Sequence, residues 1–100
     1  MVILKGFRTY ELAVRLYREC EQVKAKSYVK DQLMRASLSV VLNLAEGSAK
    51  PTPKDRKRFY AMSLGSLRET QSILDLLQAQ DALKLSDELG ACCYKLVHSN

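Results

Sequence analysis

The sequence predicts an all-α protein that folds as an antiparallel up-down-up-down four-helix bundle. Apolar residues recur at intervals of three and four, the period of a helix that buries one face. Only four glycines and two prolines interrupt the 100 residues, so the helical stretches are long. The connections between these stretches are short, which favours consecutive helices that pack side by side in opposite directions.

Length and composition limit the class of protein. A chain of 100 residues forms one domain, residues 1–100, around one core. With 47% hydrophobic and 27% charged residues it is typical of a globular chain, and no apolar run approaches the ~18 residues of a membrane span. Three cysteines are an odd number, and the early charges Lys5 and Arg8 are unlike a signal peptide. We therefore expect a cytoplasmic protein without a disulfide scaffold and without a membrane partner.

The first helix, predicted over residues 8–25, carries two neighbouring apolar stripes. Together they form a face wider than one core needs, so we expect the second stripe to contact another subunit. The first stripe contains Tyr10, Ala13, Val14, Tyr17 and Cys20, and the second, the predicted oligomer interface, contains Leu12, Leu16 and Val23.

The second helix is predicted from Tyr28 or Val29 to Glu46. Its second half is apolar around nearly the whole circumference, which predicts burial on several sides and suggests contacts with other subunits. Gly47 follows and suits the left-handed conformation that commonly ends a helix.

The third helix begins with a strong start signal and the fourth with a weaker one. Thr52 is suited to cap the helix N-terminus and Pro53 to occupy its first position, and no breaker except Gly65 follows until about Gln80. We expect the small residues Ser63, Gly65 and Ser66 to allow a close approach to a neighbouring helix. The fourth helix is predicted to start near Ser86.

The sequence offers few groups for catalysis or metal binding. His98 is the only histidine and lies within the final three residues, and the cysteines Cys20, Cys92 and Cys93 lack metal-ligand spacing. The scattered glycines form no phosphate-binding loop. We therefore predict a protein that is not an enzyme, with no catalytic residue, no metal and no cofactor.

Asn43 and Glu46 stand out as polar residues on the nearly uncharged half of the second helix. Their spacing of three puts them on one face. A buried carboxylate needs a partner, for which Arg56, Arg58 and the hydroxyls of the third helix are candidates. We interpret the pair as a structural polar network that fixes helix register, with a ligand site as the alternative.

Positive charge is concentrated in the first part of the chain. Residues 1–60 hold thirteen of the sixteen basic and six of the eleven acidic side chains, and five cations lie within residues 50–58. Such a segment can neutralise phosphates, although a charge run is also typical of a solvated face. No helix-turn-helix, zinc finger or aromatic platform is visible, so we expect contacts to the backbone of RNA or DNA with little sequence selectivity. The predicted nucleic-acid-binding residues are Lys50, Lys54, Arg56, Lys57, Arg58, Arg8, Arg15 and Arg18.

Three blocks of sequence resemble a known family. These are Phe7, Tyr10 and Leu12 near the start, N-L-A-E-G at residues 43–47, and L-G-S-L-x-E-T-Q at residues 64–71. Together they are similar to the four-helix-bundle proteins of 23S ribosomal RNA intervening sequences. The same family includes the accessory variability determinant proteins of diversity-generating retroelements.

The resemblance implies a small bundle that assembles as a ring-like homopentamer with a basic surface. For the retroelement members it also implies binding of nucleic acid and of a reverse transcriptase. Ala13 stands near a position where many members have Trp, and Val41 where many have Pro, which removes a kink from the second helix.

Two hypotheses about function follow. The first is a non-enzymatic homo-oligomeric accessory protein that binds nucleic acid through its basic surface and partners a retroelement reverse transcriptase in diversity generation. The alternative is a structural protein-interaction scaffold of the intervening-sequence branch without intrinsic nucleic-acid binding.

Overall fold

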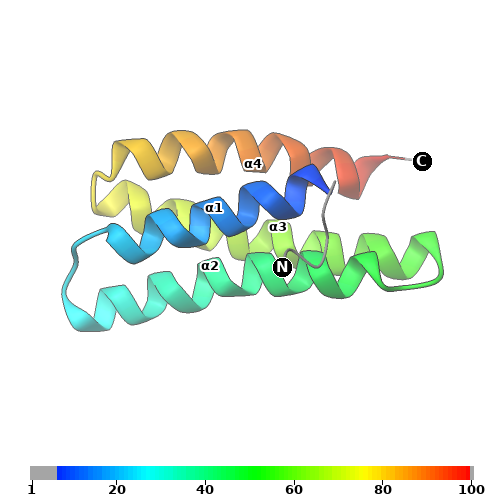
Figure 1. The fold of residues 1–100 in the computed structure, drawn as a ribbon, viewed down its shortest axis with the longest axis horizontal. Helices are drawn as coiled ribbons and strands as arrows, with labels where there is room; N and C mark the ends of the chain where they lie inside the picture. The colour runs from blue at the N-terminus through cyan, green and yellow to red at the C-terminus, as the bar shows by residue number, and fades with distance from the viewer. Residues whose placement is uncertain (1–6, 100) are drawn as a thin grey trace.

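The computed structural model describes residues 7–99, and each of the four expected helical segments forms a helix in it. The helices are α1 (Arg8–Gln22), α2 (Ser27–Ser48), α3 (Pro53–Leu76) and α4 (Gln80–His98), and no strand occurs over the described range. Figure 1 shows the α1–α2 and α3–α4 connections at one end of the molecule and the α2–α3 connection at the other. α1 and α3 each pack against both α2 and α4 but not against each other. The predicted all-α class with four helices is therefore confirmed.

Each helix turns one stripe of apolar residues inward, as the period of three and four predicts. Burial of a leucine of this kind contributes about 1.5–3 kcal/mol, so the core is the main source of stability. Within residues 7–99 no helix is both long and apolar enough to cross a membrane. The most deeply buried large side chains are Leu16, Leu33, Leu44, Leu67, Leu74, Leu89 and Val40.

α1 ends earlier than the predicted residue 25, because Lys30 of α2 closes it. The ammonium group of Lys30 donates hydrogen bonds to the carbonyl oxygens of Cys20 at 2.9 Å, of Glu21 at 2.8 Å and of Val23. These carbonyls lie at the C-terminal end of the helix, where intrahelical donors run out, and that of Cys20 also accepts from the Val23 amide at 3.2 Å. Val23 is already extended, with φ −73° and ψ 128°. A lysine side chain eight residues beyond the helix end therefore sets its limit.

Gly47 does not end α2 in a left-handed conformation, so this prediction is wrong. The helix continues to Ser48, and Gly47 is buried inside it. A Cβ atom on Gly47 would lie 2.7 Å from Cε1 and 2.9 Å from Cδ1 of Tyr60. The position therefore requires glycine because the ring of Tyr60 on α3 packs directly on the backbone of α2.

The start of α4 also differs from the prediction. α3 ends at Leu76, and the next turn contains Gln78 in the left-handed region with φ 56°, followed by a hydrogen bond of 3.0 Å from the Ala79 amide to the Leu74 carbonyl. α4 begins directly after this turn, at Gln80. The expected cap, Ser86, is buried in the helix, and its hydroxyl donates to the Leu83 carbonyl at 2.7 Å. A sequence search for a capping side chain misses this start because Ala79 provides none.

Serine hydroxyls link α2 to α3. A close approach was expected at Ser63, Gly65 and Ser66, and the two serines provide it. The Ser63 hydroxyl donates to the Val40 carbonyl at 2.8 Å, and the hydroxyls of Ser66 and Ser39 lie 2.8 Å apart. Gly65, in contrast, has no atom within 4 Å of its Cβ position. Serine contacts, and not Gly65, hold these two helices close together.

Candidate nucleic-acid interface

The α2–α3 connection is a short, well-defined turn. The amides of Ala49 and Lys50 donate to the carbonyls of Glu46 and Gly47 at 3.2 and 3.1 Å, which closes α2. The Thr52 side chain then accepts a hydrogen bond of 3.2 Å from the Asp55 amide. This is the cap expected from Thr52 and Pro53, and it satisfies one of the free amides at the start of α3. The turn lies at one end of the molecule (Figure 1).

We use the name basic turn for Lys50, Lys54, Arg56, Lys57 and Arg58. Within this cluster, two cations lie near the half-buried ring of Phe59. The ammonium of Lys50 is 4.9 Å and the guanidinium of Arg58 is 4.8 Å from the ring centroid. These cation–π contacts orient charged groups while keeping them near solvent.

Only part of the charge of the basic turn is neutralised. Lys50 pairs with Glu46 at 2.9 Å, and Arg56 donates from Nη1 to the Lys50 carbonyl at 3.0 Å. Lys54, Lys57 and Arg58 form no ion pair with any other residue in the described part of the chain. The turn thus retains several cations that an anion can approach.

The three predicted arginines of α1 do not lie in the same cluster. Arg8 pairs with Glu88 of α4 at 2.7 Å and Arg18 pairs with Glu21 at 3.2 Å, while Arg15 is exposed. α1 lies across the bundle from α3, since these two helices do not contact each other. Three glutamates accompany the three arginines on α1, so its charge is balanced. The structure therefore brings together five of the eight predicted cations and leaves the other three on a separate, charge-balanced helix.

The predicted polar pair is separated in the structure. Asn43 donates to the Ser39 carbonyl at 2.9 Å and to the Ser39 hydroxyl at 3.0 Å, next to the hydroxyl of Ser66. Glu46 is exposed, and its carboxylate faces Lys50 instead of Arg56 or Arg58. Asn43 thus belongs to a polar network between α2 and α3, and Glu46 belongs to the surface near the basic turn.

Two of the predicted interface residues are core residues of the single chain. Leu12 is 2% and Leu16 is 1% exposed, and Val23 is half-buried. Residues with so little exposed surface cannot contact a second copy while the bundle stays intact. Any contact through α1 must use its outer residues.

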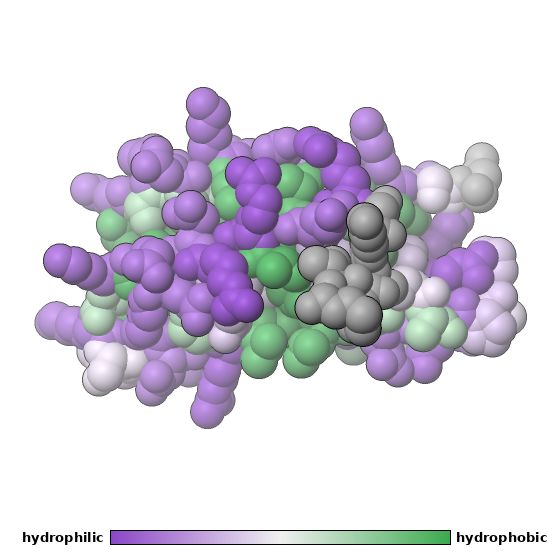
Figure 2. All heavy atoms as spheres, viewed as in Figure 1, coloured by the Kyte–Doolittle hydropathy of each residue, from purple (hydrophilic) through white to green (hydrophobic). Residues whose placement is uncertain are grey.

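The single chain leaves part of the apolar circumference of α2 exposed. Leu38 is 41% and Leu42 is 56% exposed, although the apolar circumference of this helix predicts burial. Figure 2 shows apolar residues gathered near the middle of the face that α1 and α2 present. A hollow on α1 and α2 is bordered by the half-buried side chains of Tyr17 and Met34, by Leu38, and by the charged Asp31 and Arg35. We call Leu38, Leu42, Tyr17 and Met34 the outer apolar face.

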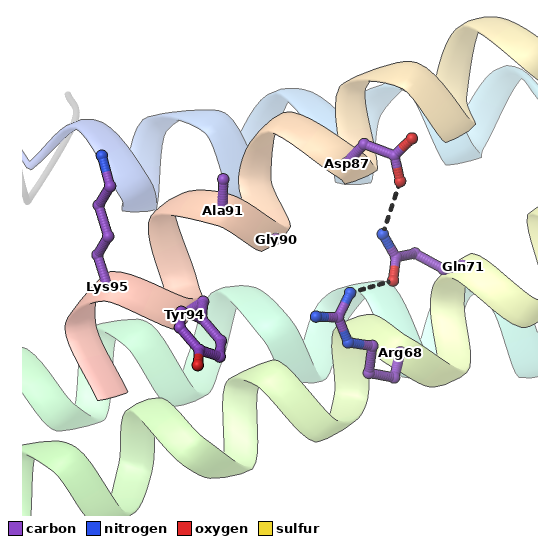
Figure 3. Close-up of a pocket in the computed structure, with 7 residues that line it drawn as sticks. All are labelled: Arg68, Gln71, Asp87, Gly90, Ala91, Tyr94 and Lys95. Atoms are coloured by element: carbon purple, nitrogen blue, oxygen red, sulfur yellow. Dashed lines mark hydrogen bonds between the residues drawn. The ribbon is translucent and has the colours of Figure 1, made fainter. Parts of the chain in front are cut away.

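A second hollow lies between α3 and α4, and the sequence had not indicated it (Figure 3). It measures about 360 Å³ and is bordered by Tyr94 of α4. Arg68 Nη1 donates to Gln71 Oε1 at 2.8 Å, and Gln71 Nε2 donates to Asp87 Oδ1 at 3.1 Å. The carboxylate of Asp87 offsets one of the two cations, Arg68 and Lys95, that line this hollow, so it suits an anion less well than the basic turn.

Cys20 and Cys93 are buried in the core, whereas His98 lies on the surface. Burial raises the pKa of Cys20 and of Cys93 to about 11, so both are neutral thiols at physiological pH. His98 is exposed, and its ring lies 4.1 Å from that of Tyr94. Over residues 7–99 no three His, Cys, Asp or Glu side chains come together as a metal site.

Comparison with known proteins identifies the family. No curated protein and no solved structure matches this chain. The model of a protein family described as 23S rRNA-intervening sequence protein matches residues 5–97, which is nearly the whole chain and includes all three sequence blocks. The protein therefore belongs to the 23S rRNA-intervening sequence protein family.

Proposed function

We propose that this protein is a non-enzymatic accessory protein that binds RNA or DNA through the basic turn, in the cytoplasm. The observation that carries the proposal is the number of cations in this turn that have no carboxylate partner. Asp55 is the only acidic residue within residues 50–58. Cations arranged in this way attract phosphates, and the contact releases counterions, so binding should weaken steeply with salt.

We further propose that the bundle has up-down-up-down topology and assembles into a ring-like homopentamer. The exposed Leu38 and Leu42 support self-association, because a monomer gains little from leaving such side chains in water. In a ring, each copy contributes one basic turn. Several weak contacts to one nucleic-acid strand then act together, which raises the apparent affinity well above that of one turn.

The proposed partner is a retroelement reverse transcriptase, with a role in diversity generation. The concentration of basic residues in the first part of the chain supports the accessory variability determinant branch of the family. A reverse-transcriptase gene and a near-repeat pair beside this gene would agree with that role. A position inside a ribosomal RNA gene would contradict it.

The nucleic-acid part is tested by fluorescence anisotropy across a salt series. The variant K54Q/K57Q/R58Q removes three cations of the basic turn and keeps the hydrogen bond of Arg56 to the turn. For a single strand we expect the slope of log affinity against log salt to fall by about 2, since each phosphate contact contributes about 0.7.

The matched control is K26Q/K84Q/K95Q. It removes the same charge from three exposed positions outside the basic turn. Both variants therefore have the same net charge and differ only in where the charge is lost. An equal loss of affinity in both would show that net charge, and not the basic turn, drives binding, and no binding by the wild type at low salt would refute the function itself.

The alternative is a structural scaffold that binds only protein. The outer apolar face favours it, since an apolar patch of this kind is typical of a protein-contact surface. This hypothesis predicts a defined oligomer by light scattering without affinity for nucleic acid. A monomer by the same measurement would remove the basis for multivalency and for the scaffold.

A further inference from the structure

A hollow of about 310 Å³ lies where α3 begins and α4 ends. Both helix ends are at the same end of the molecule as the α2–α3 connection (Figure 1). The walls combine two cations, two hydroxyls and two apolar side chains. These residues are Arg56, Lys57, Tyr60, Ser99, Pro53 and Leu96.

The two cations of the hollow are half-buried and lack a carboxylate. Arg56 is held by its hydrogen bond of 3.0 Å to the Lys50 carbonyl, which orients the guanidinium without neutralising it. Neither Arg56 nor Lys57 forms an ion pair in the described part of the chain, and no acidic residue lines the hollow. Partly desolvated cations of this kind attract an anion more strongly than cations on an open surface.

Tyr60 supplies a second, independent indication. Its side chain is only 9% exposed, because the ring packs against the backbone at Gly47 and lies 6.2 Å from the ring of Phe7. Its hydroxyl forms no hydrogen bond with residues 7–99. No inaccessible side-chain polar atom of these residues is left unpaired, and Tyr60 lines the hollow.

The ionisation state of Tyr60 suits it to donate a hydrogen bond. Burial raises the pKa of Tyr60, and the charge of Arg56 opposes this shift only in part. The hydroxyl is therefore neutral at physiological pH and has a proton to donate to an anion.

We infer that this hollow holds one phosphate ester group of a nucleic-acid strand, with Arg56 and Lys57 pairing with its charge and the Tyr60 hydroxyl donating to an oxygen. The inference rests on the proposed function and names the point at which the strand is held. The volume is at the lower limit of small-ligand sites, which suits a single nucleotide. Pro53 and Leu96 offer apolar contact to its sugar.

A purely structural role for the two cations makes different predictions. Arg56 and Lys57 lie beside the end of α4, where the last carbonyls of a helix attract positive charge. If that were their whole role, their loss would lower the melting temperature and leave ligand affinity unchanged. Binding and thermal unfolding must therefore be measured on the same variants.

In the experiment the full chain is titrated with three probes, and binding is measured by isothermal titration calorimetry. Adenosine 5′-monophosphate carries a terminal phosphate, adenylyl-(3′→5′)-adenosine carries an internal phosphodiester, and adenosine carries none. Binding of the monophosphate alone identifies a strand end as the source, and binding of both phosphate esters identifies the backbone. Adenosine should not bind, and equal binding of adenosine would overturn the inference.

The decisive comparison is between two neighbouring lysines of α3. Lys57 lines the hollow, whereas Lys54 is exposed and does not. We expect K57Q to weaken phosphate binding about tenfold, as for the loss of a charge-assisted hydrogen bond, and K54Q less than about twofold. Y60F, which keeps the ring, should weaken it about fivefold. The exposed K84Q serves as the unchanged control.

The two proposals fail in distinguishable ways. If an oligonucleotide binds the wild type but K54Q and K57Q weaken it equally, the basic turn acts as a diffuse surface and the hollow is not a site. If no oligonucleotide binds at low salt, the proposed function fails as well.

Discussion

The two ends of the bundle use lysine in opposite ways. At the α1–α2 end, the ammonium of Lys30 donates to carbonyl oxygens of Cys20, Glu21 and Val23 and closes a helix. At the α2–α3 end, Lys54 and Lys57 have no such partner within residues 7–99, and the amides of Ala49 and Lys50 close α2 instead. The same residue type therefore has a structural role at one end and is available for a partner at the other. Charge counts along a sequence do not make this distinction.

The largest expected effect on stability comes from the contact between Gly47 and the Tyr60 ring, close to the basic turn. In G47A the new Cβ would lie 2.7 Å from the Tyr60 ring, so the ring or α2 must shift. Overpacking of this kind costs about 1–3 kcal/mol. Chemical denaturation measures it, and G65A is the matched control, because nothing lies within 4 Å of its Cβ position. G65A should gain about 0.5–1 kcal/mol from higher helix propensity, and a loss in G65A equal to that in G47A would contradict the packing explanation.

Removing Lys30, at the α1–α2 end, should have the next largest effect on stability. K30M keeps an unbranched side chain but removes the Lys30 donor from three carbonyls, of which that of Cys20 keeps the Val23 amide, and we expect a loss of about 1–2 kcal/mol. The equivalent change K54M should alter stability by less than about 0.5 kcal/mol, as is usual for an exposed position. Equal losses in both variants would remove the distinction between the two ends.

Thiol alkylation locates the effect of K30M. Cys20 is fully buried beside the carbonyls that Lys30 caps, and Cys93 is fully buried elsewhere in the core. Local opening of the α1 terminus should speed alkylation of Cys20 more than that of Cys93. Uniform acceleration at both cysteines would indicate global destabilisation instead.

The Thr52 cap at the N-terminus of α3 is expected to contribute less to stability. T52A removes the acceptor of the Asp55 amide and should cost about 1 kcal/mol. T52S keeps a hydroxyl and serves as the control. If T52S loses as much as T52A, the hydrogen bond is not the source of the loss.

The smallest expected effect is a gain in stability at the turn between α3 and α4, which lies at the same end of the bundle as the α1–α2 connection (Figure 1). Gln78 has a left-handed backbone with φ 56°, a conformation that glycine adopts at lower cost. Q78G should therefore raise stability by about 0.5–1 kcal/mol in thermal unfolding. Q78A keeps a Cβ and should not show this gain.

Some features were predictable because they depend on neighbouring residues. Thr52 and Pro53 are two adjacent residues whose chemistry starts a helix, and the structure uses both as expected. The prediction for Gly47 was wrong because glycine is compatible both with a left-handed helix end and with close packing of an aromatic ring. The early start of α4 at Gln80 was missed because its signal is a left-handed Gln78, which a sequence pattern does not reveal.

The candidate site was predictable in part. The five cations of the basic turn are close in sequence and stay close in the structure. The hollow beneath them was not predictable, because Leu96 and Ser99 come from the far end of the chain. Which leucines form the outer apolar face was not predictable for a similar reason, since Leu38 and Leu42 fit a buried stripe as well as an exposed one.

The sequence by itself determined the four helices and the position of the basic turn, because helix period, capping and charge density act over a few residues. Only the tertiary structure decided which lysine caps a helix and which remains available, which glycine holds a ring, and which leucines face solvent. These outcomes depend on distances between helices that are far apart in the chain. Local sequence patterns carry little information about such distances, whereas the packing of the four helices sets them.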